Sequence, residues 1–131
     1  MNRLIPNIAG ALYGLLFIAF AVMFLTGNMP EDPNPPAEGS PAALFMGAMF
    51  PTGYLKLVKV LELLGGLLVV IPRTRNYGLL ILVPIVVNIV AFHMLVRQDG
   101  IMNPILLVVI ALTAFLLFAE RKAIAGLAHR N

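Results

Sequence analysis

The sequence predicts an all-α membrane protein, a bundle of four transmembrane helices that forms a single domain over residues 1–131, with a short interfacial helix in its first outer loop. Three observations favour this class. Hydrophobic residues make up 60% of the chain and charged residues only 11%, whereas a soluble domain has about 25% charged residues. Four apolar stretches are long enough to cross about 30 Å of hydrocarbon as helices. Most basic residues stand at the ends of these stretches.

The composition also excludes several classes of function. A chain of 131 residues cannot hide this much apolar surface in an aqueous core, so lipid is expected to solvate it. The absence of cysteine excludes disulfides, thiolate metal sites and thiol redox chemistry. The net charge is +3, but no stripe of Lys and Arg forms a face that would follow a phosphate backbone. We therefore expect no nucleic-acid partner.

Four spans are expected, at about 4–27, 52–71, 77–96 and 101–119. They are predicted to be helices because lipid offers no partner to an open strand edge. The first span resembles a secretory signal, but its apolar stretch exceeds the usual h-region of about 7–15 residues, and no A-x-A-like cleavage site follows it. We expect it to remain as an uncleaved first span.

The distribution of basic residues predicts the orientation. Six of them lie on one side of the predicted membrane: Arg3, Arg73, Arg75, Arg121, Lys122 and Arg130. The other side has only Arg97, and the connection 28–51 carries Glu31, Asp32 and Glu38 without any Lys or Arg. Basic flanks stay in the cytoplasm. The prediction is a plasma-membrane protein (the inner membrane in a bacterium) with both ends inside and loop 28–51 outside.

Loop 28–51 is predicted to contain the short helix. Its proline-rich first part, 28–39, has little helix potential. Ser40 and Pro41 are typical of an N-cap followed by proline at the first helical position, and Pro51 would end the helix. Phe45, Met46, Met49 and Phe50 would share one side and lie at the outer interface. The alternative is a helical start to the second span, bent at Pro51.

Charged residues inside the second span are the first candidates for function. Lys59, Glu62 and Gly66 fall within about 60° of one another on a helix, and Lys56 begins the same stripe. Lys59 and Glu62 are three residues apart and can form an ion pair, which lets a low-dielectric site hold both charges. Gly65 and Gly66 allow another helix to approach closely just below the pair.

The third span adds Asn88 and His93 to this set. Because it runs antiparallel to the second span, Asn88 is expected at about the depth of Glu62, and His93 nearer the outer surface. Pro84 frees a backbone carbonyl and can kink the helix beside these residues. One interpretation is an outward-facing ligand or proton site centred on Glu62 and formed by Lys56, Lys59, Glu62, Asn88 and His93. The alternative is a structural ion pair, with Asn88 joining helices and His93 at the interface.

Methionine forms a second, weaker pattern. The six internal methionines all fall in the outer half or outer loops: Met23, Met29, Met46, Met49, Met94 and Met102. Met46 and Met49 have M-x-x-M spacing and, with His93 and Met94, would be soft ligands for Cu(I). Flexible gap-filling at an interface explains the same pattern. We favour the second explanation and expect no metal.

The segments GYLKLVKVLELLGGLLVV (53–70) and LLILVPIVVNIVAFH (79–93) resemble the DoxX-like family of small four-helix membrane proteins. The similarity covers about residues 45–95, and the flanking spans match it only in hydropathy and placement. The resemblance implies a four-helix bundle, often in a respiratory or redox setting, and its founding member is a subunit of a thiosulfate:quinone oxidoreductase. The absence of cysteine separates this chain from thiol-based relatives.

Three functions are consistent with these residues. The first is a non-catalytic accessory protein or subunit that binds a larger membrane complex, or a second copy of itself. The second is a redox component that binds a quinone, a lipid or another small solute in the Glu62 cavity. The third is a small proton-coupled exporter, which the strong charge bias and the long loop 28–51 oppose. No complete catalytic constellation is visible in the sequence, so an enzymatic activity is not expected.

The orientation generates the first testable prediction. In intact cells, the Asn34→Cys variant should react with a membrane-impermeant maleimide and the Asn76→Cys variant should not, because 28–51 lies outside and 72–76 inside. Since the chain has no other cysteine, each signal belongs to one site. The reverse labelling pattern would contradict the charge argument.

Overall fold

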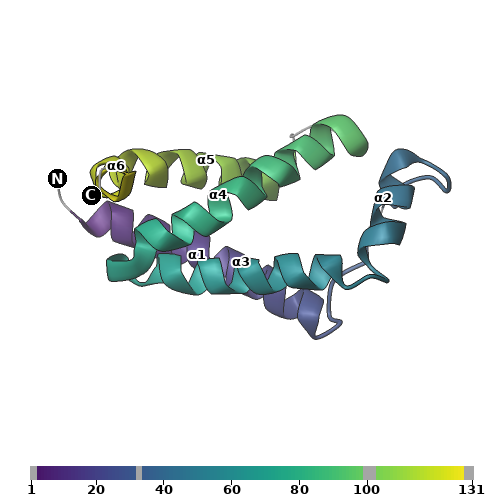
Figure 1. The fold of residues 1–131 in the computed structure, drawn as a ribbon, viewed down its shortest axis with the longest axis horizontal. Helices are drawn as coiled ribbons and strands as arrows, with labels where there is room; N and C mark the ends of the chain where they lie inside the picture. Colours follow the sequence, from purple (N-terminus) through teal and green to yellow (C-terminus); the bar gives the residue numbers. More distant parts are fainter. Residues whose placement is uncertain (1–2, 32–33, 99–102, 129–131) are drawn as a thin grey trace.

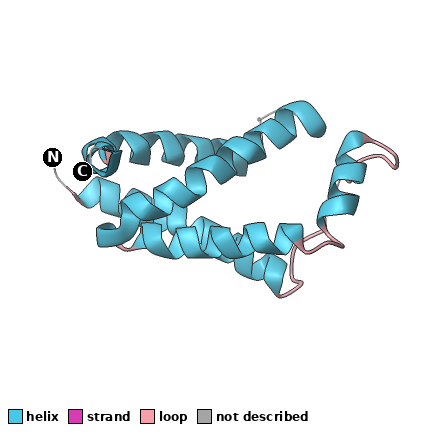
Figure 2. Ribbon diagram, viewed as in Figure 1, coloured by secondary structure: helices cyan, strands magenta, loops and turns pink. Residues whose placement is uncertain are grey.

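The computed structural model describes residues 3–31, 34–98 and 103–128. Within these ranges the chain consists of helices joined by loops and has no strand, which confirms the predicted all-α class (Figure 2). Two helices, Leu4–Leu25 and the continuous segment Pro72–Val96, are long and apolar enough to cross a membrane. A third span is present if the bent pair at the C-terminus counts as one. The start of the predicted fourth span at Ile101, together with Asp32, Met102 and Arg130, lies outside the described residues.

The helices follow the predicted order with shifted ends. They are α1 (Leu4–Leu25), α2 (Pro41–Met49), α3 (Tyr54–Val70), the 3-10 turn η1 (Pro72–Thr74), α4 (Arg75–Ala91), the π-helical segment η2 (Phe92–Val96), α5 (Pro104–Ala119) and α6 (Arg121–Ala128). With 17 residues, α3 is about 26 Å long, and α5 has 16 residues. Both are shorter than the roughly 20 residues that hydrocarbon requires. The two predicted spans at these positions are therefore shorter than expected.

The helix α2 begins where the sequence predicts it. The Ser40 hydroxyl accepts a hydrogen bond from the Ala43 amide at 3.3 Å, and Pro41 occupies the first turn. Gly53, between α2 and α3, has a φ of 78°, a conformation that glycine adopts at little cost. This turn separates the two helices, so α2 is not a bent beginning of α3.

The C-terminal helix α6 is absent from the sequence prediction, which ends the fourth span in a tail. The chain bends by 70° between α5 and α6. Glu120 lies at the bend, is buried, and forms an ion pair with Arg3 at 2.6 Å. Ile124 of α6 packs against the core. Contacts with the N-terminus thus hold α6 across the end of the bundle.

Glycines bring three helices to backbone distance. A Cβ atom added to Gly66 of α3 would lie 2.8 Å from the Gly14 carbonyl oxygen of α1. On the α4 side, a Cβ atom on Gly78 would lie 2.6 Å from the Gly65 carbonyl oxygen and 2.7 Å from the Val69 nitrogen. Adjacent glycines of α3 therefore contact two different helices. Small residues at such crossings are typical of helix packing in membranes.

Arg75 joins the same three helices. The sequence places it among the cytoplasmic flanking charges, but the structure buries it fully at the start of α4. Its Nε donates to the Val69 carbonyl at 2.9 Å, in the last turn of α3, and its Nη1 donates to Asn7 Oδ1 of α1 at 3.0 Å. The last carbonyls of a helix have no partner within the helix. Arg75 thus satisfies one of them and ties α3 to α1.

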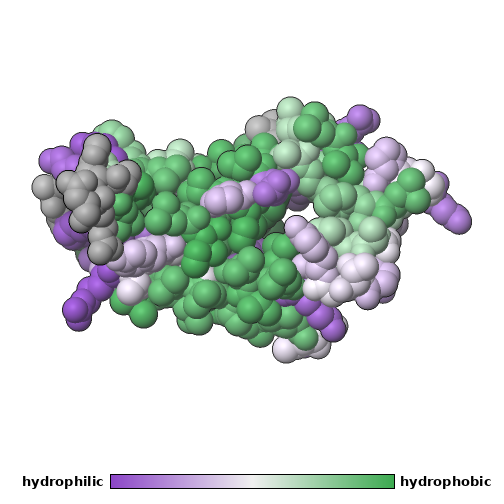
Figure 3. Space-filling view, viewed as in Figure 1, coloured by the Kyte–Doolittle hydropathy of each residue, from purple (hydrophilic) through white to green (hydrophobic). Residues whose placement is uncertain are grey.

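The two ends of the bundle differ in width (Figure 1). Helix α4 lies against α3 near the termini, diverges from it towards η2, and α2 stands across the wide end. The core lies mainly at the narrow end, where the Tyr13 hydroxyl and Thr113 Oγ1 are hydrogen-bonded at 2.8 Å between α1 and α5. The visible face is mainly apolar along its middle, where one small hydrophilic patch interrupts it, and more hydrophilic towards both ends (Figure 3). This pattern is compatible with membrane integration.

The glycine contacts generate the second prediction. Replacing Gly78 with Ala should lower the free energy of unfolding by about 2 kcal/mol, because the new methyl group meets backbone atoms that cannot move aside. The matched control is Gly47→Ala in α2, where nothing lies within 4 Å. It should leave stability unchanged or raise it by up to about 1 kcal/mol through helix propensity. Unfolding in detergent micelles measures both, and equal effects would contradict the close contact.

Candidate functional site

Two cavities open in the wide half of the bundle. The bundle cavity, of about 340 Å³, lies between α1, α3, η2 and the start of α5, with Phe17, Phe20 and Leu106 on its wall. The α2 cavity, of about 640 Å³, lies between α2, α3, α4 and η2. Both are lined mainly by apolar atoms.

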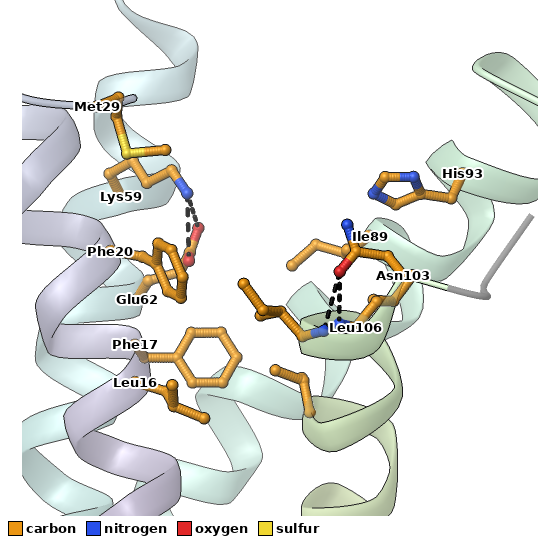
Figure 4. Close-up of a pocket in the computed structure, with 12 residues that line it drawn as sticks. Leu16, Phe17, Phe20, Met29, Lys59, Glu62, Ile89, His93, Asn103 and Leu106 are labelled. Atoms are coloured by element: carbon orange, nitrogen blue, oxygen red, sulfur yellow. Dashed lines mark hydrogen bonds and ion pairs between the residues drawn. The ribbon is translucent and has the colours of Figure 1, made fainter. Parts of the chain in front are cut away.

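Four residues line both cavities: Lys59, Glu62, Ile89 and His93. Lys59 and Glu62 point from α3 into the hollow, and His93 faces it from the opposite side, on η2 (Figure 4). The predicted pair and the predicted histidine thus line the same cavities from two consecutive helical segments, α3 and α4 with η2. They form a polar boundary between two apolar spaces.

The ion pair at this boundary is loose. Lys59 Nζ lies 3.4 Å from Glu62 Oε2 and 3.5 Å from Oε1, whereas charge-assisted hydrogen bonds are usually about 2.7–2.9 Å long. Glu62 is only 3% exposed. The Lys59 ammonium also lies 5.7 Å from the centroid of the Phe24 ring. A carboxylate has about four acceptor positions, so Glu62 retains capacity towards the cavities.

The position of His93 depends on the π-helical segment. Phe92–Val96 continues α4 with wider turns, and the Arg97 amide donates to the Phe92 carbonyl at 2.8 Å. The π-helical geometry is rare and is frequent at functional sites. It lies directly after the ordinary helical turns of α4 and carries the His93 ring, which is half-buried, to the cavity wall. No local sequence signal predicts this change of pitch.

The two other predicted site residues, Asn88 and Lys56, differ in their relation to the cavities. Asn88 is exposed at the α2 cavity and donates its amide hydrogen to the Pro84 carbonyl at 3.0 Å, within its own helix. The alternative interpretation expects Asn88 to join two helices, but the hydrogen bond observed lies within α4. Lys56 is exposed and lines neither cavity.

Of the four residues in the weaker copper hypothesis, three line one cavity and one does not. Met46, Met49 and His93 line the α2 cavity, but Met94 is exposed and does not. In the described ranges no group of three or more His, Cys, Asp or Glu side chains is placed to hold a metal ion. Met46 and Met49 are part of the mainly apolar lining of the α2 cavity.

The sequence analysis missed Asn103. Its Oδ1 caps α5 by accepting from the Ile105 and Leu106 amides at 2.9 and 3.4 Å, and the residue lines the bundle cavity near His93 (Figure 4). The cap leaves the side-chain NH₂ group as a donor. Asn followed by Pro before an apolar run is a recognisable N-cap signal. The expected span 101–119 instead places Asn103 within a membrane-spanning helix.

Comparison of the chain with protein-family models, with curated proteins and with solved structures gives no match in any of the three searches. The function is therefore inferred from the residues that line the two cavities.

The pair generates the third prediction. Glu62→Gln should destabilise the protein by about 3 kcal/mol, because it leaves the Lys59 charge without its partner in an apolar setting. Combining Lys59→Met with Glu62→Gln should recover most of this loss. Thermal unfolding of the purified variants measures both. If the double variant is no more stable than Glu62→Gln alone, the two charges do not stabilise each other.

Proposed function

We propose that this chain is an integral membrane protein that binds a small lipid-soluble molecule against the Lys59–Glu62 pair. The observation that carries the proposal is the position of that pair, with His93 opposite, on the shared wall of two apolar cavities. Binding sites for small molecules are typically concave, about 300–1,000 Å³ in volume, and apolar with a few polar groups. Both cavities fall in this range.

The charges at the site favour a neutral ligand. Lys59 and Glu62 neutralise each other, so a charged ligand would leave one charge uncompensated in a medium where that is costly. A neutral molecule with a hydrogen-bond acceptor can accept a hydrogen bond from the Lys59 ammonium. If the molecule also has a donor, it can donate a hydrogen bond to the Glu62 carboxylate. Asn103 and His93 offer further polar contacts across the bundle cavity. A quinone and a neutral lipid both meet these requirements.

We further propose the four-span arrangement of a DoxX-like protein, with both ends in the cytoplasm and α2 at the outer surface of the plasma membrane. The exposed basic residues at the narrow end support it: Arg3, Arg73, Arg121 and Lys122. The short helix α3 fits a span because Lys56, which is exposed, stands near its outer end and can extend towards the headgroups. The bend into α6 fits a helix that turns along the inner surface.

A second candidate is the non-catalytic accessory subunit. The exposed apolar side chains at the wide end favour it, since Leu44 of α2 and Leu95 of η2 are 66% and 73% exposed. Apolar residues on the water-facing side of a membrane protein are typical of a surface that a partner covers. The two functions are compatible, since an accessory subunit can also hold a ligand.

The fourth prediction tests the ligand. Protein purified in mild detergent should retain a neutral lipid-soluble molecule that mass spectrometry identifies after solvent extraction. The double variant Lys59→Met with Glu62→Gln should lose most of it, by about tenfold, which corresponds to the loss of one or two hydrogen bonds to charged groups. Lys56→Gln is the matched control and should retain it, because Lys56 lies outside both cavities.

Two outcomes would count against the proposal. Wild-type protein that retains nothing above the level of bulk lipid has no such site. Equal retention by the double variant and the wild type would place the molecule elsewhere on the protein. If the double variant instead loses a co-purifying protein, the accessory function is the better description.

A further inference from the structure

The helix α2 forms one wall of the α2 cavity. Phe45 and Met46 lie on successive positions of α2, and Met49 is one turn further; all three line the cavity. The opposite walls belong to α3 and to α4 with η2. In Figure 1, α2 stands across the wide end of the bundle, where α3 and α4 are farthest apart. A molecule that reaches Glu62 through this end must pass α2.

The packing of α2 against the rest of the molecule is sparse. Ala42 is the one residue of the helix that is buried, and Leu44 is 66% exposed. The main side-chain contact of α2 with η2 is between the rings of Phe45 and Phe92, whose centroids are 5.2 Å apart. Few buried contacts are the mark of a segment that opens at low free-energy cost.

Glycines in the left-handed backbone conformation flank α2 at both ends. Gly39 has a φ of 81° and Gly53 a φ of 78°, and nothing lies within 4 Å of the Cβ position of either residue. Between them, the Ser40 cap holds α2 together as a helix. Hinges are a few such residues at the ends of an element, which absorb the change in backbone angles while the element moves as a body.

We propose that α2 is a movable wall of the ligand site, and that a ligand reaches Glu62 from the outer membrane surface when the Phe45–Phe92 contact opens. This inference rests on the proposed function, since it names the entrance of that same site. The occupant is a neutral molecule with an apolar body, which the flexible thioethers of Met46 and Met49 accommodate by changing rotamer. Phe45 and Phe92 then select ligands by limiting the width of the entrance.

The absence of cysteine makes the movement measurable. A single thiol introduced as Val58→Cys would lie on the α2 cavity wall, and its rate of reaction with N-ethylmaleimide, a small uncharged reagent, reports how often the cavity is open. Adding Phe45→Ala should raise this rate about threefold to tenfold, the range expected for loss of one aromatic contact. Phe92→Ala should have the same effect, and the two together should add little to either alone.

Two matched controls separate opening from general loosening. Leu44→Ala removes a similar side chain from the neighbouring position of α2, but a more exposed one that lines neither cavity, and should leave the rate at Val58→Cys unchanged. In the second control the thiol is introduced as Lys56→Cys, outside both cavities. Its rate of reaction with N-ethylmaleimide should be the same whether or not Phe45→Ala is also present. Unchanged size-exclusion profiles and melting temperatures would show that each variant is folded.

If Phe45→Ala and Leu44→Ala raise the reaction rate at Val58→Cys equally, or if neither raises it, the proposal that α2 is a movable wall is wrong. The measurement needs no ligand, so its failure is distinct from failure of the proposed function. If the double variant Lys59→Met with Glu62→Gln loses the ligand but Phe45→Ala does not change the reaction rate at Val58→Cys, the binding site is supported and the proposed entrance at Phe45 is wrong. If Phe45→Ala raises the reaction rate at Val58→Cys but the purified wild-type protein retains no molecule, the movement of α2 is supported and the proposed ligand binding is wrong.

Discussion

The close contact of α3 with both of its neighbours constrains the rest of the structure. On one side α3 meets α1 and on the other α4, and each crossing depends on glycines: Gly14, Gly65, Gly66 and Gly78. Two helices that touch at backbone distance near one end must separate towards the other, because they cross at an angle. The separation of α4 from α3 at the wide end is visible in Figure 1. The cavities beside Glu62 are thus a geometric consequence of contacts that Gly65 and Gly66 make about one turn further along α3.

Arg75 complements these contacts at the narrow end. A buried guanidinium is costly unless it is hydrogen-bonded, and Arg75 donates to both α3 and α1. The bond to the Val69 carbonyl places a positive charge at the C-terminal end of α3, where the helix dipole favours it. Glu120, itself held by Arg3, contributes a compensating negative charge nearby. The narrow end therefore contains the buried polar contacts of Arg75, and the wide end carries the elements with few contacts.

Features set by neighbouring residues were predictable from the sequence. Ser40 and Pro41 predict the start of α2, and the spacing of Lys59 and Glu62 predicts their ion pair. Both predictions succeed because each depends only on residues within one turn of helix. The all-helical class follows from composition alone. The burial of Arg75 was not predictable, since a basic residue between two spans has the same sequence appearance whether it faces water or the bundle. The π-helical turn at His93 and the bend at Glu120 likewise depend on packing between distant segments.

The shortness of α3 has a consequence for the membrane around it. In the proposed four-span arrangement, a helix of about 26 Å stands in hydrocarbon about 30 Å thick. Such a hydrophobic mismatch is relieved by local thinning of the bilayer, at a cost of fractions of a kcal/mol per Å. Acyl chains beside α3 are then shortened and disordered relative to those beside α1. The protein would accordingly favour thinner regions of membrane, and would deform the lipid on the same side on which its cavities lie.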